Sequence, residues 1–203
     1  NVIKESNYVC IDSDEDSVAM GSDAHPSADF RFFDRFNPMI NPLGKPNEAL
    51  PLKETEKFDV IIIFMKGSNQ EPKELYSDLK KLHTHLTPGG CIIVGLFVRE
   101  VALNYFVVRR SHEYGSLSPT LVEDTEKSDF FAFINNDTII SNQEYIDYNK
   151  NPDLAEVEHF TWFWNNDYFV SQLRKMFPEG EIGSRRLPPM WSIHNPFVIR
   201  KKA

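Results

Sequence analysis

Four short apolar runs in the first half of the chain have the length and composition of buried strands. They cover residues 8–11, 30–33, 58–64 and 91–97, and the third reads FDVIIIF. A β-branched run without polar alternation is typical of a parallel strand that is covered on both faces. We therefore predict that the four runs lie parallel to each other in one sheet.

A helix is predicted between the third and fourth runs. Its apolar positions recur at spacings of four, three and four residues and form one stripe, at Leu75, Leu79, Leu82 and Leu86. Pro72 suits the first turn, and the Pro-Gly-Gly sequence at 88–90 is expected to stop the helix, because glycine adopts the left-handed geometry of a sharp exit. Strand, helix and strand with short links make a right-handed βαβ unit.

The rest of the chain has a less regular pattern. Residues 18–24 favour a short helix, and residues 128–141 favour a hairpin that turns at 135–137. A second amphipathic helix is predicted over 167–177, with Asn165 or Asn166 as its cap. Two strands are predicted in 181–188 and 195–202, the last of them antiparallel.

Length and charge narrow the classes of protein to consider. The 203 residues suffice for one domain with a sizeable core, and the net charge of −8 argues against a dedicated nucleic-acid binder. No apolar run reaches the length of a membrane span. Cys10 and Cys91 sit in apolar stretches, which favours buried free thiols in a reducing compartment. We therefore expect a cytoplasmic protein that does not contact membranes.

The histidines suggest acid–base chemistry more readily than metal binding. No spacing typical of metal ligands recurs among them, so no metal site is predicted. His159 and His194 are candidates for a general base. No nucleophile elbow accompanies them, and no catalytic residue is assigned from the sequence.

Four segments, in order, resemble the class I S-adenosylmethionine-dependent methyltransferases. They are YVCIDSD, FFDRFNPMINPLG, KFDVIIIF and LTPGGCIIVGLF, at 8–14, 32–44, 57–64 and 86–97. The second is similar to a bacterial subgroup with a Tyr-Asn-Pro-x-Gly loop. The resemblance implies an α/β fold: a doubly wound, mostly parallel Rossmann-like sheet with helices on both faces. It also implies a single domain over residues 1–203, with an insertion at about 99–164.

The same resemblance implies a site for S-adenosylmethionine. Asp12 matches the acid that binds the ribose hydroxyls, and Asp34 matches the acid near the adenine amino group. A carboxylate suits the first role because it can accept from both hydroxyls. Phe64, Met65 and Lys66 match the loop that lines the methionine and methyl-transfer region. The alternative for Asp12 is a solvated turn residue.

The sequence departs from this family in two places. The glycine-rich turn that normally follows the first strand is missing, because the eleven residues before Asp12 contain no glycine. The given chain thus lacks the usual first strand, which is central in the family's sheet. We expect a fragment whose start lies outside the given sequence; the alternative is a rebuilt fold. After FDVIIIF, the sequence at 65–69 is Met-Lys-Gly-Ser-Asn, where the subgroup has Ser-x-Phe-Thr-His.

Two functions follow from the resemblance and its departures. The first is methyl transfer from S-adenosylmethionine to a small molecule or glycan. The alternative is a non-catalytic methyltransferase-like module for binding or scaffolding. Trp162 and Trp164, in the insertion, are candidates for an aromatic lid that binds the substrate, and the alternative is that they close the core over the sheet.

Overall fold

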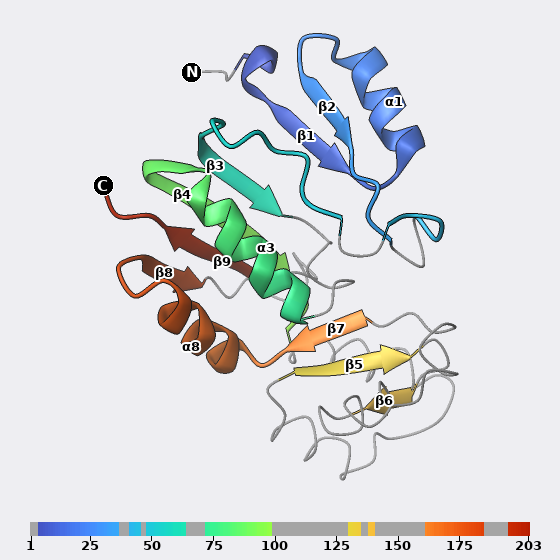
Figure 1. The fold of residues 1–203 in the computed structure, drawn as a ribbon. Helices are drawn as coiled ribbons and strands as arrows, with labels where there is room; N and C mark the ends of the chain where they lie inside the picture. The colour runs from blue at the N-terminus through green and yellow to red at the C-terminus, as the bar shows by residue number, and fades with distance from the viewer. Residues whose placement is uncertain are drawn as a thin grey trace. The chain divides into compact units, whose positions relative to one another are not determined.

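The computed structural model describes residues 4–36, 41–45, 48–63, 72–98, 130–134, 138–140, 161–184 and 195–203. It divides into two compact units, Asn1–Glu56 and Lys57–Ala203. Figure 1 shows the first unit in blue to cyan and the second from teal to red. The prediction of a single domain with an insertion at about 99–164 stays a prediction.

The first unit is a small βαβ arrangement. It contains the 3-10 turn η1 (Glu5–Asn7), strand β1 (Val9–Asp12), helix α1 (Glu15–Ala24) and strand β2 (Asp29–Phe32). β1 and β2 are parallel, with Asp12 opposite Phe32 (Figure 1). α1 begins earlier than the predicted residue 18, because the Asp14 carboxylate caps it by accepting from the Ser17 hydroxyl at 2.6 Å and from the backbone N–H of Asp16.

The second unit contains a four-stranded sheet. Its strands β3 (Phe58–Ile63), β4 (Leu86–Leu96), β8 (Glu181–Ser184) and β9 (Asn195–Arg200) lie in the order β3-β4-β9-β8. β3 and β4 are parallel, and β9 runs antiparallel to both of its neighbours. This arrangement confirms the predicted pair of terminal strands, and the fold is of the α/β class.

Helices α3 (Pro72–Thr84) and α8 (Asn166–Met176) cover one face of this sheet (Figure 1). The Asn165 side chain caps α8, as predicted, by accepting from the backbone N–H groups of Asp167 and Tyr168 at 3.1 Å each. The core between helices and sheet is fully buried and includes Leu75, Leu79, Phe169, Leu173, Ile92, Val94, Leu96, Phe197 and Ile199. Both helices thus bury the apolar stripes that their sequences predicted.

The other face of the four-stranded sheet is apolar and open among the described residues. Val60 and Ile62 on β3 are 49% and 54% exposed. In register with them on β4 lie Cys91 and Ile93, which are half-buried. The sequence predicted cover on both faces, and the described residues supply it on one.

The prediction of one sheet for the first four runs is wrong for the described residues. β1 pairs with β2 and β3 pairs with β4, each pair parallel as predicted, but the two pairs belong to separate sheets. Each parallel pair is joined by its own helix, α1 between β1 and β2 and α3 between β3 and β4, so neither pair needs the other to form its ladder.

The Pro-Gly-Gly sequence does not end the helix. α3 ends at Thr84, where the carbonyl of Thr84 accepts from the Lys57 ammonium at 2.9 Å. β4 then starts at Leu86, and Gly89 takes its positive φ of 77° inside the strand, where the pairing with β3 shifts register. Gly89, with its left-handed backbone, therefore accommodates a β-bulge in β4 and does not terminate α3.

A third sheet has three antiparallel strands in the order β6-β5-β7. They are β5 (Phe130–Ile134), β6 (Thr138–Ile140) and β7 (Thr161–Trp164). β5 and β6 confirm the predicted hairpin. The two cysteines are free thiols as expected, but both are half-buried and not fully enclosed.

Candidate functional site

Asp12 and Asp34 lie at the same edge of the first unit. Asp12 is the last residue of β1, and Asp34 follows the end of β2 by two residues. The two strand ends are joined because the backbone N–H of Phe33 donates to the carbonyl of Asp12 at 2.7 Å. The carboxyl ends of parallel strands are where open α/β sheets bind ligands. The structure thus brings together two of the predicted site residues.

The Asp12 carboxylate is exposed and only partly engaged. Its Oδ1 accepts from the backbone N–H of Asp14 at 3.0 Å, while its Oδ2 has no partner in the part of the chain that the structure describes. One oxygen is therefore held in a turn, and the other can accept from a ligand hydroxyl. The turn fixes the carboxylate between the end of β1 and Asp14, the N-cap of α1.

Asp34, in contrast, organises its own loop. Its carboxylate accepts from the Lys45 ammonium at 3.0 Å and from the Asn41 amide at 3.3 Å, and its backbone carbonyl accepts from the N–H of Lys45. The hydrogen bonds from Lys45 and Asn41 lower the pKa of Asp34. A Cβ on Gly44 would lie 2.6 Å from the backbone of Arg35, so the loop is closed tightly there. The role that the structure gives Asp34 is loop folding, and its contact with adenine stays a prediction.

Several predicted site residues lie outside the described residues. These are the loop residues Phe64, Met65 and Lys66 and the candidate bases His159 and His194. The part of the chain that is described holds no group of three or more potential metal ligands. It also contains no helix that is both long enough and apolar enough to cross a membrane.

Trp164 lies at the carboxyl end of β4, where its backbone N–H donates to the carbonyl of Phe97 at 2.9 Å. Its side chain is fully buried, with ring centroids 5.7 Å from Tyr76 and 5.0 Å from Phe169. This burial favours the alternative in which the tryptophan closes the core. Trp162 pairs with Ala132 within the third sheet, and its side chain is outside the described residues.

Two buried amides near the same end of β4 were not singled out as site residues by the sequence analysis. Asn195 is 6% exposed and pairs with Leu96, and Asn166 is 9% exposed at the first residue of α8. The Oδ1 of Asn166 is enclosed without a hydrogen-bond partner among the described residues. In the sequence, Asn165 and Asn166 are simply an Asn-Asn pair before a predicted helix. The pattern does not tell which of the two side chains caps the helix and which is buried.

Comparisons with known proteins give similarity at the level of structure alone. No protein-family model matches the chain, and no curated protein matches its sequence. Among solved structures, the chain is similar to a SAM-dependent methyltransferase from Methanosarcina mazei, with 17% identity, a TM-score of 0.47, and coverage of 96% of this chain and 81% of that one.

Two further solved structures are similar over nearly the whole chain. One is the 1,6-didemethyltoxoflavin-N1-methyltransferase of Burkholderia thailandensis with bound 1,6-didemethyltoxoflavin and S-adenosylhomocysteine, at 12% identity and a TM-score of 0.48. Coverage is 97% of this chain and 62% of that one. The other is an S-adenosylmethionine-dependent methyltransferase from Clostridium acetobutylicum, at 12% identity, a TM-score of 0.47, and coverage of 97% and 76%.

Proposed function

We propose that this chain is part of an S-adenosylmethionine-dependent methyltransferase that acts on a small molecule or a glycan. The observation that carries the proposal is the position of Asp12. An exposed carboxylate ends a parallel strand, keeps one oxygen without a partner among the described residues, and is held by a turn that leads into α1. This is the place where the sequence resemblance puts the acid that binds ribose.

The described residues fit the sugar of the cofactor better than its base. The free oxygen of Asp12 can accept from a ribose hydroxyl, and a charged acceptor makes a strong hydrogen bond. Asp34 would have to share its carboxylate between the adenine amino group and Lys45. When bound, the cofactor supplies a methyl group activated on a sulfonium. The protein's part is to align this donor with the acceptor.

Calorimetric titration with S-adenosylhomocysteine tests the proposal. Asp12→Ala is expected to weaken binding by about 1–3 kcal/mol, the cost of losing a charged hydrogen-bond partner. Glu15→Ala is the matched control, since Glu15 is an exposed acid in the first turn of α1 and has no place in the proposed site. Equal affinity of the wild type and Asp12→Ala would remove Asp12 from the site.

The second candidate is a non-catalytic methyltransferase-like module. One observation favours it: the Asp34 carboxylate is already engaged by Lys45 and Asn41. On this view, neither S-adenosylmethionine nor S-adenosylhomocysteine binds at millimolar concentration. Binding of either cofactor form with the expected loss in Asp12→Ala would reject this candidate.

A further inference from the structure

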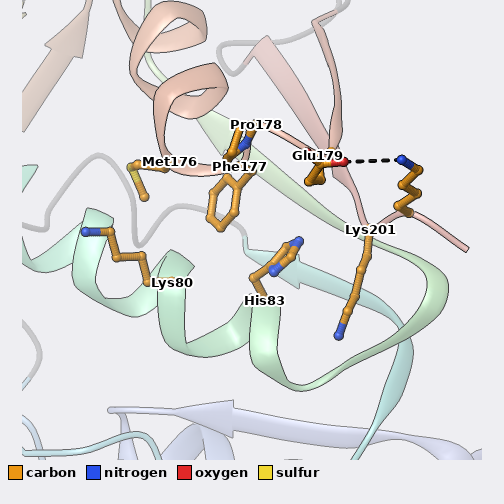
Figure 2. Close-up of a pocket in the computed structure, with 9 residues that line it drawn as sticks. Lys80, His83, Met176, Phe177, Pro178, Glu179 and Lys201 are labelled. Atoms are coloured by element: carbon orange, nitrogen blue, oxygen red, sulfur yellow. Dashed lines mark hydrogen bonds and ion pairs between the residues drawn. The ribbon is translucent and has the colours of Figure 1, made fainter.

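Two stacked rings join the ends of α3 and α8. His83 lies in the last turn of α3, and its ring centroid is 4.5 Å from that of Phe177, with an interplanar angle of 29°. Phe177 is the C-cap of α8, where its backbone N–H donates to the carbonyl of Leu173. Figure 2 shows the two rings facing each other from the two helices. This ring stack therefore connects two elements that are far apart in the sequence.

The ring stack is closed to water on the side of Nε2. Phe177 is only 7% exposed, and the Nε2 atom of His83 is enclosed without a hydrogen-bond partner among the described residues. A neutral imidazole has one N–H group and can carry it on Nδ1, so that Nε2 needs no acceptor. A charged imidazole has a proton on both nitrogens, and its Nε2–H would be a buried donor without an acceptor. The ring stack thus suits the neutral ring.

The charged groups around His83 also disfavour its protonated form. A pocket of about 450 Å³ borders the ring stack, and the charged side chains that line it are Lys80, Glu179, Lys201 and Lys202. The Lys201 ammonium is held in place because it donates to the carbonyl of Leu86 at 3.0 Å. The Glu179 carboxylate is engaged by Lys202 at 3.2 Å. The lining among the described residues therefore offers no second carboxylate to a charged imidazole.

Burial, and after it the charge of Lys201, lower the pKa of His83 from its ordinary value of 6.5. The C-terminal end of a helix favours a charged histidine by itself, so these two effects outweigh the helix end. A histidine whose pKa is lowered in the stacked state contributes its full stability above pH 6.5. That contribution is lost as the pH falls from 6.5 through the lowered pKa.

We propose that the ring stack is a pH-sensitive latch, which holds the end of α8 on α3 at neutral pH and opens when His83 is protonated. The adjoining pocket gives the charged ring room to turn towards water. The released part is the last turn of α8 and the turn that follows it, because Phe169 and Leu173 keep the rest of the helix in the core. The latch does not depend on the proposed cofactor site.

The first test is an NMR titration of the full chain from pH 8 to pH 5. The ring signals of His83 should titrate below pH 6.5, and the nuclear Overhauser contact between the rings of His83 and Phe177 should disappear with the same midpoint. A contact that persists through the titration of His83 would overturn the proposal. Titration of His83 at pH 6.5 or above would overturn it too.

Hydrogen exchange of the amides in 174–180 measures the opening of the latch. After correction for intrinsic exchange, the open fraction should rise by up to about tenfold per pH unit below pH 6.5. His83→Phe keeps a ring without a titrating group and should abolish this dependence. His25→Gln, which removes an exposed histidine of the first unit, is the matched control and should retain it.

Phe177→Leu provides a second variant that keeps His83 in place. It weakens the ring stack, so the pKa of His83 should move back towards 6.5, and an unchanged titration would count against the latch. The same pH dependence of exchange in the wild type and His83→Phe would overturn the proposal. Equal protection of 174–180 and 91–96 at pH 5.5 would also overturn it, because acid would then open the whole second unit.

Discussion

Arg31 joins parts of the first unit that are far apart in sequence. Its guanidinium donates to the carbonyl of Pro51 at 2.7 Å, to the Glu56 carboxylate at 2.9 Å, and to Asp29 on the same strand. The side chains of Arg31 and Glu56 are only 14% and 19% exposed, so the pair is partly shielded from water. One side chain thus fastens the 51–56 segment to β2.

Glu56→Gln is expected to destabilise the protein by about 1–2 kcal/mol at pH 7, since it leaves a partly buried cation with a weaker partner. Hydrogen bonding from Arg31 lowers the pKa of Glu56 to about 2, against an ordinary value of 4.5. A depressed pKa gives stability that is present above pH 4.5 and lost as the pH falls towards 2.

Urea unfolding of Glu56→Gln and the wild type, measured between pH 7 and pH 2.5, checks this. The difference in the free energy of unfolding should shrink below about pH 4.5. Glu54→Gln serves as control, because Glu54 is exposed and makes no hydrogen bond or ion pair among the described residues. A difference that stays constant over the whole pH range would contradict the assignment.

The positions of individual site residues were predictable where they depend on strand ends. Asp12 could be placed because an apolar run stops there, and the structure ends β1 at that residue. The partners of Asp34 could not be predicted, because Asn41 and Lys45 reach it only after the loop has folded. The burial of Trp164 could not be predicted from the sequence either, because it depends on contacts with Tyr76 and Phe169, which belong to other elements.

At the scale of elements, α1 packs unusually closely on β2. The helix has no fully buried residue, but a Cβ on Gly21 would overlap the ring of Phe30. In an exposed helix, glycine to alanine stabilises by about 1 kcal/mol. Here the close contact is expected to reverse the sign of that effect.

Gly21→Ala is therefore expected to destabilise the protein by about 1–3 kcal/mol, the usual cost of inserting a methyl group into a packed contact. Urea unfolding measures the change, and Phe30→Leu in the same chain should recover part of the loss by making room. Ser22→Ala, on the exposed side of the same helix, is the control for propensity. A more stable Gly21→Ala variant would show that the contact is not tight.

The helices of the second unit could be predicted within two residues because their stripes recur over three turns. The sequence pattern put their ends at 86 and 177, and the structure puts them at Thr84 and Met176. The sequence pattern could not predict the bulge in β4, because a glycine with a positive φ is equally compatible with a helix end and a strand bulge. Sheet membership could not be predicted either, because two βαβ units have the same sequence pattern whether they share one sheet or form two.

At the scale of the whole molecule, the two units differ in how much they bury. β4 is paired on both sides, and its core-facing residues are fully buried. α1 has no buried residue, and the first unit's sheet has two strands among the described residues. Small two-stranded sheets are marginal on their own.

Hydrogen exchange should therefore be slowest in β4 and β9 and faster in β1 and β2. Amides in the central pair exchange only when the core of the second unit opens, which costs the largest free energy. Mass spectrometry of peptides from 91–96 and 9–12, at fixed pH and temperature, measures the difference. Equal protection in the two peptides would mean that the units open together.

One face of the second unit's sheet is uncovered among the described residues, and this has a consequence for handling the protein. Val60 and Ile62 leave about half of their surface in water, so we expect them to contribute to colloidal attraction between molecules. Val60→Thr with Ile62→Thr keeps the β-branched shape that strands prefer. We expect this pair to raise the solubility limit and reduce concentration-dependent association in sedimentation runs, with the melting temperature unchanged. Ile92→Thr, at a fully buried position of β4, should instead lower the melting temperature and the soluble yield.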